Sequence, residues 1–520
     1  MPSFSVENFG CRATQADGAA LERQFLERGM ERAQVARDAE IVVLNTCTVT
    51  EGADKDARAS IRRLQRVNPD CRILVTGCYA QRAPEELAAL PGVTWVVGNS
   101  HKHQAAEIAT ASGSAGFVSI DQLSRQTLEF PHNHNERDCV GHPEIVHPEI
   151  VVGDIFAHTE LMAAPVFEAA NERTRPNLKV QDGCDNRCSF CVIPYVRGQS
   201  RSLPAERVLA EVRTLVEAGY REVVISGINL GRWGRDLESS SQLPVVGRSS
   251  LVVGELKPAT IGRSSKHQFA MNPERPAAND QRLVDLIRAI LAQTSLEKLR
   301  ISSVEPMDWS DELIELVASS PRIAKHAHVP MQSGSDAVLR RMHRKYRPWH
   351  YREKILKIRE AMPHAAIGAD VMVGFPGESE AEFAETRRMI EELPFTYLHV
   401  FTYSVRPDTP AAGLSGQVPV ALARKRNGVL REIASAKKAA FLRSQIGTVV
   451  EAITLQSQGA DFTEALTDNY LKARVAGHLE ANQWVQLCVQ AIEGEMLVGQ
   501  LVEPAAADRQ RTDGQAEARP

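Results

Sequence analysis

Short apolar runs alternate with helical segments through the first hundred residues, and this alternation limits the folds that are open to the chain. Three of the runs resemble β-strands and each leads into a cysteine: FSVENFGC, IVVLNTC and RILVTGC. Strands and helices in regular alternation predict a doubly wound α/β domain with a parallel sheet, whose strands end at one edge. Cys11, Cys47 and Cys78 are therefore expected to meet in one crevice of an N-terminal domain, residues 1–118.

The same alternation returns in residues 171–442. The strand candidates LKVQD, EVVISG, KLRISS, HAHVPMQ, AIGADVMVG and YLHVFTY are each followed by polar or glycine-containing segments. They predict an open (β/α) barrel of about six units with its chemistry at the carboxyl ends of the strands. Residues 237–280 are rich in Ser, Gly and Pro and indicate an insertion into this unit. Residues 119–170 contain a tandem His-Pro-Glu-Ile-Val repeat and are expected to be an irregular linker rather than a metal-binding tract.

Residues 443–506 contain short β-like runs without intervening helices, which predicts a small antiparallel β-barrel. Residues 507–520 lack apolar content and are expected to be disordered. We find no signal peptide and no run of ~18 apolar residues. Nine cysteines in 520 residues are too few for a disulfide scaffold, so we expect a reducing, cytoplasmic setting. The net charge of −4 leaves any binding of nucleic acid to local basic patches.

The segment VQDGCDNRCSFC places Cys184, Cys188 and Cys191 within eight residues. A structural zinc site uses four ligands, commonly in two separated pairs. Three thiolates in one short loop suit an iron–sulfur cluster better, because the loop can wrap three of its corners. A cluster held by three cysteines leaves one iron open to a substrate. From the spacing alone, zinc remains an alternative.

This C-x-x-x-C-x-x-C motif, with Phe190 before its last cysteine and at the end of the first barrel strand, resembles the radical S-adenosylmethionine superfamily. The resemblance implies a [4Fe–4S] cluster that binds S-adenosylmethionine and cleaves it to a 5′-deoxyadenosyl radical, which abstracts hydrogen from a C–H bond. The later segments SGIN, SSVEP, PMQSGS and GFPGE resemble the cofactor contacts of that superfamily. The residues that the resemblance assigns to the cofactor are Phe190, Gly227, Asn229, Ser303, Glu305, Gln332, Ser333, Gly374 and Phe375.

The segments GCRAT, NTCTVT and GCYAQ, placed before such a barrel, resemble the methylthiotransferases of this superfamily. The resemblance assigns Cys11, Cys47 and Cys78 to an auxiliary [4Fe–4S] cluster. It assigns Cys184, Cys188 and Cys191 to the catalytic radical cluster. The predicted terminal barrel resembles the RNA-binding TRAM domain of the family. The remaining cysteines match no ligand: Cys71, which is expected to pack in the core, Cys139 and Cys488.

Within that family, NTCTVTEGADKDARASIRR, VQDGCDNRCSFC and HVFTYSVRPDTPAA most resemble the branch that acts on N6-threonylcarbamoyladenosine in tRNA. The implied reaction adds a methylthio group to C2 of that nucleoside, at tRNA position 37. The implied partners are tRNA, S-adenosylmethionine and an electron donor protein, with no membrane; the oligomeric state stays open. Alternatives are isopentenyladenosine in tRNA, an aspartate of a ribosomal protein, or a non-catalytic, metal-bearing RNA-binding protein.

Local basic patches supply candidates for RNA binding. Residues 340–354 hold seven Lys or Arg against one Glu, with Tyr346, Trp349 and Tyr351 interleaved. Basic side chains contact phosphates and aromatic rings stack on unpaired bases. The alternative is an outer barrel helix whose aromatic residues pack inward. The candidate RNA contacts are Arg344 and Arg347 in this segment, Arg197, Arg201 and Arg207 near the cysteine loop, and Lys472 and Arg474 in the terminal barrel.

Overall fold

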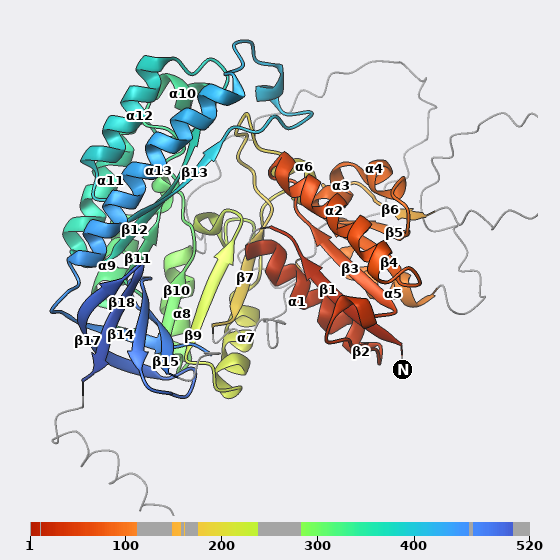
Figure 1. The fold of residues 1–520 in the computed structure, drawn as a ribbon, viewed down its shortest axis with the longest axis horizontal. Helices are drawn as coiled ribbons and strands as arrows, with labels where there is room; N and C mark the ends of the chain where they lie inside the picture. Colours follow the sequence, from red (N-terminus) through yellow and green to blue (C-terminus); the bar gives the residue numbers. More distant parts are fainter. Residues whose placement is uncertain are drawn as a thin grey trace, which may run out of the picture.

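The computed structural model describes residues 2–10, 12–111, 148–157, 161, 175–237, 282–456 and 461–502. Figure 1 shows an N-terminal α/β unit, a larger half-barrel with helices on its outer side, and a small β-barrel beneath the half-barrel. Almost all of the predicted insertion, Cys11, Cys139 and the predicted disordered tail lie outside the described residues. No helix of the described part is long and apolar enough to cross a membrane.

The N-terminal unit is a parallel sheet of order β2-β1-β3-β4-β5-β6. Apolar cores cover both of its faces, one under α2, α3 and α4 and the other under α1 and α5, so the predicted doubly wound fold is confirmed. Its strands are β1 (Ser3–Asn8), β2 (Glu31–Arg32), β3 (Ile41–Thr46), β4 (Arg72–Gly77), β5 (Val93–Gly98) and β6 (Glu149–Val151). Its helices are α1 (Arg12–Glu27), α2 (Glu51–Val67), α3 (Cys78–Arg82), α4 (Pro84–Ala88) and α5 (Ala105–Ala111).

Strand β6 falls within residues 119–170, where the sequence predicts an irregular linker, so the prediction is wrong at this point. The second His-Pro-Glu-Ile-Val repeat supplies the strand, which pairs with β5 in parallel through Trp95 and Glu149. A strand of three residues at the edge of a sheet is too short to show an alternation of apolar and polar residues. The sequence pattern therefore does not predict it. Cys71 packs in the core beneath α2, as expected.

The half-barrel has six parallel strands: β7 (Asn177–Asp182), β9 (Glu222–Gly227), β10 (Lys298–Ile301), β11 (His326–His328), β12 (Ala366–Val373) and β13 (Tyr397–Thr402). Isolated parallel bridges, Leu299 to Ile323 and Ser303 to His328, join the β10 side to the β11 side. The short β8 (Arg201–Ser202) runs antiparallel to β7. The predicted open barrel of six units is therefore confirmed.

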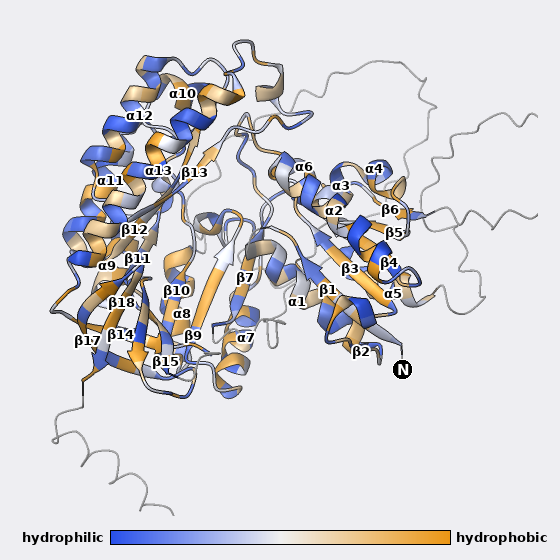
Figure 2. Ribbon diagram, in the orientation of Figure 1, coloured by the Kyte–Doolittle hydropathy of each residue, from blue (hydrophilic) through white to orange (hydrophobic). Residues whose placement is uncertain are grey.

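Helices cover the outer face of the half-barrel, and Figure 2 shows apolar residues concentrated in the strands beneath them. They are α7 (Ala205–Glu217), α8 (Leu283–Gln293), α9 (Asp311–Ser319), α10 (Asp336–Arg341), α11 (Pro348–Ala361), α12 (Glu380–Glu392) and α13 (Val420–Arg443). Helix α6 (Ile193–Arg197) instead packs against α3 of the N-terminal unit. Because the helices take the outer face, the strand ends and the inner face remain for ligands.

The terminal barrel closes in the order β14-β15-β16-β18-β17. It was predicted to be antiparallel, but β16 and β18 pair in parallel, so the barrel is mixed. Buried Arg300 of β10, which forms an ion pair with Glu222 of β9, joins the half-barrel to the terminal barrel by a hydrogen bond to the Asp468 carbonyl (2.9 Å). Its strands are β14 (Val449–Thr454), β15 (Phe462–Thr467), β16 (Lys472–Ala476), β17 (Trp484–Glu493) and β18 (Met496–Leu501).

Candidate active site at the strand ends

The loop that carries Cys184, Cys188 and Cys191 begins where β7 ends. Gly183 makes the turn at φ +72°, and a Cβ there would lie 1.9 Å from the Gln199 carbonyl oxygen, so only glycine fits. The loop is fixed by backbone hydrogen bonds from Cys184 to Gly198 (3.1 Å) and from Ser189 to Met342 (3.1 Å). The three thiols are thus held on a short, supported loop at the mouth of the half-barrel.

Polar groups converge on these thiols. The Asn186 amide and the Asn229 side chain donate to Cys184 Sγ at 3.4 and 3.6 Å, and Arg344 Nη1 donates to Cys188 Sγ at 3.2 Å. Burial raises the pKa of Cys184 to about 11 and the pKa of Cys191 to about 12. Buried thiols with such pKa values ionise when a metal binds them. Three soft donors with hydrogen-bond donors around them therefore fit an iron–sulfur cluster.

Two adjoining hollows flank this loop and share Asn186, Arg232 and Lys345. One also includes Asn229 and the other includes Glu305, so cationic and anionic groups face the same space. Among the described residues, Asn229 Oδ1 and Ser226 Oγ are buried without a hydrogen-bond partner. Unpaired buried polar atoms beside an acidic and basic lining fit a ligand with both an ammonium and a carboxylate group, such as S-adenosylmethionine.

The structure brings only part of the predicted cofactor set to these hollows. Phe190 stacks edge-on against Phe375 (6.4 Å between ring centroids), and Phe375 is fully buried, so it supports Phe190 rather than presenting a face to a ligand. Ser333 is buried and hydrogen-bonds to Thr386 of α12 (3.1 Å), so its side chain faces a helix. The others lie at strand ends or in the loops that follow them: Gly227, Ser303, Gln332 at φ +61° and Gly374 at φ +74°.

Arg344 was predicted to contact RNA, and the structure contradicts this. Its side chain is buried, forms an ion pair with Glu305 and contacts Cys188. Burial raises the pKa of the Glu305 carboxyl, although the Arg344 guanidinium opposes this. Arg344 therefore belongs to the cysteine site, because its guanidinium is enclosed by these partners and not open to a phosphate.

The other candidates in the 340–354 segment divide by burial. Tyr346 and Tyr351 are buried, so the alternative of inward packing is confirmed for both, whereas the Trp349 side chain is 56% exposed. Arg347 donates to the carbonyls of Arg344 and Tyr346 and lies 3.3 Å from Asp336. These local partners reduce its capacity to bind phosphate. The basic composition of this segment therefore overstated its accessible positive charge.

In the N-terminal unit, Cys47 and Cys78 follow Thr46 and Gly77, which are partners in the β3–β4 register. Both cysteines are buried. Gly10 lies directly over Cys47, because a Cβ at Gly10 would stand 2.4 Å from the Cys47 Cβ. The chain thus brings the segment next to Cys11 onto Cys47. The sequence-based expectation that three strand ends converge is supported for the part that the structure describes.

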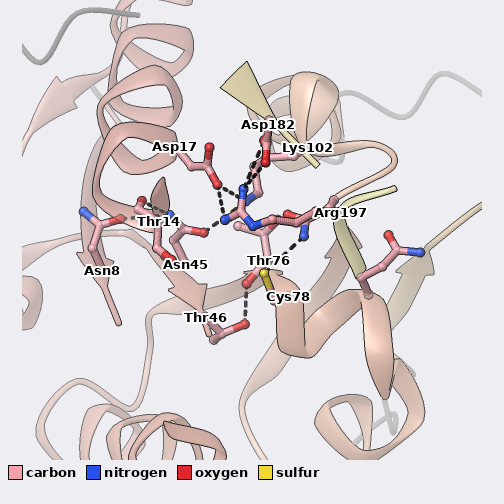
Figure 3. A network of polar contacts seen from close by, with 12 residues as sticks. Asn8, Thr14, Asp17, Asn45, Thr46, Thr76, Cys78, Lys102, Asp182 and Arg197 are labelled. Atoms are coloured by element: carbon pink, nitrogen blue, oxygen red, sulfur yellow. Dashed lines mark hydrogen bonds and ion pairs between the residues drawn. The ribbon is translucent and has the colours of Figure 1, made fainter. Parts of the chain in front are cut away.

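A buried ion network joins the N-terminal unit to the half-barrel (Figure 3). Asp17 of α1 accepts from Lys102 (3.0 Å), from Arg197 (2.8 Å) and from Lys179 of β7. Arg197 also pairs with Asp182 (3.0 Å). Burial alone would raise the pKa of Asp17, yet Arg197, Lys102 and Lys179 hold that pKa well below its ordinary value. Three cations face two carboxylates, which leaves one positive charge in excess.

This network lies between the two groups of cysteines. Asn99 donates to the Val196 carbonyl (2.7 Å) and to Cys78 Sγ (3.5 Å), and Cys78 packs against Val192 and Val196. Both valines follow Cys191 in the chain. The network therefore lies beside Cys78 of the N-terminal unit and includes Arg197 of the helix that follows Cys191. Arg197 is consequently a buried part of this network, and its predicted RNA contact is wrong.

One feature of the sequence signals this network, although it does not identify the partners. Strand β7 reads NLKVQD and is buried at every position, whereas a strand of a parallel sheet with both faces covered is normally apolar. Lys179 and Asp182 in such a strand require buried partners. Their sequence positions do not reveal that these partners are Asp17 of α1 and Arg197 of α6.

Comparisons with known proteins cover both units. Residues 3–98 match the model of uncharacterized protein family UPF0004, and residues 178–231 and 271–390 match the Radical SAM superfamily. The threonylcarbamoyladenosine tRNA methylthiotransferase of Bacillus subtilis is 32% identical over 92% of this chain and 91% of its own. Its counterpart in Aquifex aeolicus is 31% identical over 93% of this chain and 99% of its own. The tRNA-2-methylthio-N6-dimethylallyladenosine synthase of Parafrankia sp. is 30% identical over 96% and 87%. The chain therefore belongs to the radical S-adenosylmethionine methylthiotransferase family.

Proposed function

We propose that the protein adds a methylthio group to C2 of N6-threonylcarbamoyladenosine in tRNA, using S-adenosylmethionine and two [4Fe–4S] clusters. The observation that carries this proposal is the placement of two sets of thiols, from separate units, on either side of one buried interface. The names of the Bacillus and Aquifex relatives support the nucleoside. We further propose that the enzyme acts in the cytoplasm and receives electrons from a donor protein.

In this proposal Cys184, Cys188 and Cys191 hold the cluster that supplies the electron for cleavage of S-adenosylmethionine. Cys11, Cys47 and Cys78 hold the auxiliary cluster. Arg344 orients Cys188 and keeps Glu305 in the adjoining hollow, where that carboxylate accepts hydrogen bonds from a bound amino group. Asn229, which lines the neighbouring hollow, donates to Cys184 and has a buried side-chain oxygen without a hydrogen-bond partner. The ion network around Asp17 fixes the orientation of the two units.

Nucleoside mass spectrometry tests the proposed substrate. The reconstituted enzyme is given one tRNA in three forms, with threonylcarbamoyladenosine, dimethylallyladenosine or unmodified adenosine at the target position. We expect methylthio product from the first form. Product from the dimethylallyl form alone would move the protein to the branch of the Parafrankia relative. Zinc in place of iron and sulfide in the purified protein would favour a non-catalytic, metal-bearing RNA-binding protein. Methylthio product on an aspartate of a ribosomal protein would favour the methylthiotransferase that acts on protein.

Lys472 is the candidate RNA contact that the structure leaves exposed in the terminal barrel. Arg474 lies 3.6 Å from Glu493 and stacks over Phe462 at 4.3 Å, so its charge is partly engaged. We expect Lys472→Ala to weaken tRNA binding and to reduce the slope of log Kd against log salt by about one, because each phosphate contact releases counterions. Arg474→Ala should have a smaller effect. Equal salt slopes for Lys472→Ala and the unchanged protein would exclude Lys472 from the RNA surface.

A further inference from the structure

The inner face of the half-barrel carries polar side chains that the cysteine site does not use. Ala327, Ile367, Ala369 and Val371 belong to the core beneath the outer helices, and Leu398 of β13 packs against the same core. Successive side chains of a strand point to opposite faces of the sheet. His328, Asp370 and His399, which lie between these apolar positions on three adjacent strands, therefore face the barrel lumen.

These three side chains form one compact group, here called the lumen triad. Asp370 and His399 are direct partners in the β12–β13 register. The ligand atoms of the three residues all lie within 4.8 Å of one another, and His328 Nε2 is 3.4 Å from Asp370 Oδ1. The imidazole rings of His328 and His399 are 5.7 Å apart. The triad therefore presents hydrogen-bond donors and a carboxylate acceptor to a single ligand.

The triad is closed from below and open at the side. Tyr470 of the terminal barrel stacks on His326 at 4.6 Å, and His326 Nε2 hydrogen-bonds to the Tyr397 hydroxyl (2.7 Å). Within the described part of the sheet, β13 pairs only with β12, and His399 on this edge is exposed. A hollow lined by Tyr397, His399 and Arg431 opens there. A ligand can reach the triad from the carboxyl ends of the strands or from this edge. The rings of Tyr470, His326 and Tyr397 block access from the side of the terminal barrel.

The position of the triad suits one part of the target nucleoside. Asp370 lies four residues before Gly374, which places it about 13 Å along the strand from the end that faces the cysteines. In adenine, C2 and C6 are both bonded to N1, so the bond from C2 to its hydrogen and the bond from C6 to N6 leave the ring in different directions. When C2 faces the cysteines at the strand ends, the substituent extends down the lumen toward the triad.

We propose that the lumen triad recognises the polar substituent on N6 of the target adenosine and so selects the nucleoside. This inference rests on the function proposed above and names the residues that read the substituent. A threonylcarbamoyl group carries a carboxylate, a hydroxyl and urea N–H groups. His328 and His399 can donate to its oxygens, and Asp370 can accept from its N–H or O–H groups. A dimethylallyl group has no polar atom to exchange hydrogen bonds with these side chains, so it would bind without that contribution to the free energy.

The test replaces His399 by phenylalanine, which keeps the ring and removes the hydrogen bonds. The control is His364→Phe, the same change at an exposed position two residues before β12 begins. Rates of methylthio formation, as kcat/KM, are compared on threonylcarbamoyl and dimethylallyl forms of one tRNA. We expect the unchanged enzyme and the control to prefer the first form by about 100-fold or more, because a site built to hydrogen-bond a group rejects an analogue that lacks it.

His399→Phe should lose at least about tenfold of that preference, and His399→Gln should retain part of it, because an amide still donates a hydrogen bond. The ratio of Kd values for anticodon stem–loops with and without the substituent should fall in the same order. Unchanged ratios in His399→Phe would overturn the role of the triad and leave the proposed function intact. An unchanged enzyme that modifies only dimethylallyl RNA would overturn both. One equivalent of zinc that is lost in His399→Phe would assign the triad to a metal and overturn the inference.

Discussion

Joint replacement of Cys184, Cys188 and Cys191 by alanine is expected to abolish cleavage of S-adenosylmethionine and to leave about half of the iron, because the other thiols belong to a separately built unit. Joint replacement of Cys11, Cys47 and Cys78 should also remove about half of the iron. It should spare cleavage and stop methylthio formation. The measurements are iron and sulfide content, 5′-deoxyadenosine release and nucleoside mass spectrometry of the tRNA.

Cys71→Ala is the matched control, because Cys71 is a buried thiol of the same N-terminal unit that packs only in the core. It should keep the full iron content and both activities. Methylthio product from the variant that lacks Cys11, Cys47 and Cys78 would rule out the auxiliary role of these residues. Loss of iron from both sites after either replacement would show that the two units do not assemble independently.

Asp17→Asn should be the most damaging single substitution outside the cysteines. It removes one of two carboxylates that face three buried cations and leaves a larger uncompensated charge at the interface between the units. Breaking a buried ion pair in this way costs about 3–5 kcal/mol, a large share of the ~5–15 kcal/mol that stabilises a typical protein. The checks are the urea midpoint of unfolding and the amount of methylthio product formed per S-adenosylmethionine cleaved, both of which should fall.

Glu27→Gln provides the comparison for Asp17→Asn. Glu27 pairs with Arg23 on the same helix, α1, but both side chains are more than half exposed. A surface pair of this kind contributes at most about 1 kcal/mol, so its loss should leave the midpoint and the coupling ratio nearly unchanged. If Asp17→Asn unfolds at the same urea concentration as Glu27→Gln, the network around Asp17 does not hold the two units together.

The positions of the cysteines could be predicted because they depend on local rules. A run such as IVVLNTC is a buried strand of a parallel sheet by its apolar composition, and the residue after a strand lies at the carboxyl edge whatever the rest of the fold does. The same rule placed Cys184 at the mouth of the half-barrel. Gly183, which makes the turn into the loop, is the residue type that a positive φ requires.

The charged residues could not be assigned in this way, because the function of a charge depends on its partners. Arg197 and Arg344 stand in basic segments and were predicted to bind RNA, yet the fold buries one against Asp17 and the other against Glu305. Those carboxylates lie far away in the sequence, and composition does not show which cation they neutralise. The lumen triad likewise requires three strands in register.

The sequence by itself determined the α/β units, the open half-barrel and the strand-end cysteines, since each follows from hydrophobic period and from residue types at turns. Only the tertiary structure decided which polar groups face one another across the interface and in the lumen. A buried charge is stable only where the fold supplies its partner, and that pairing is set by the packing of distant segments.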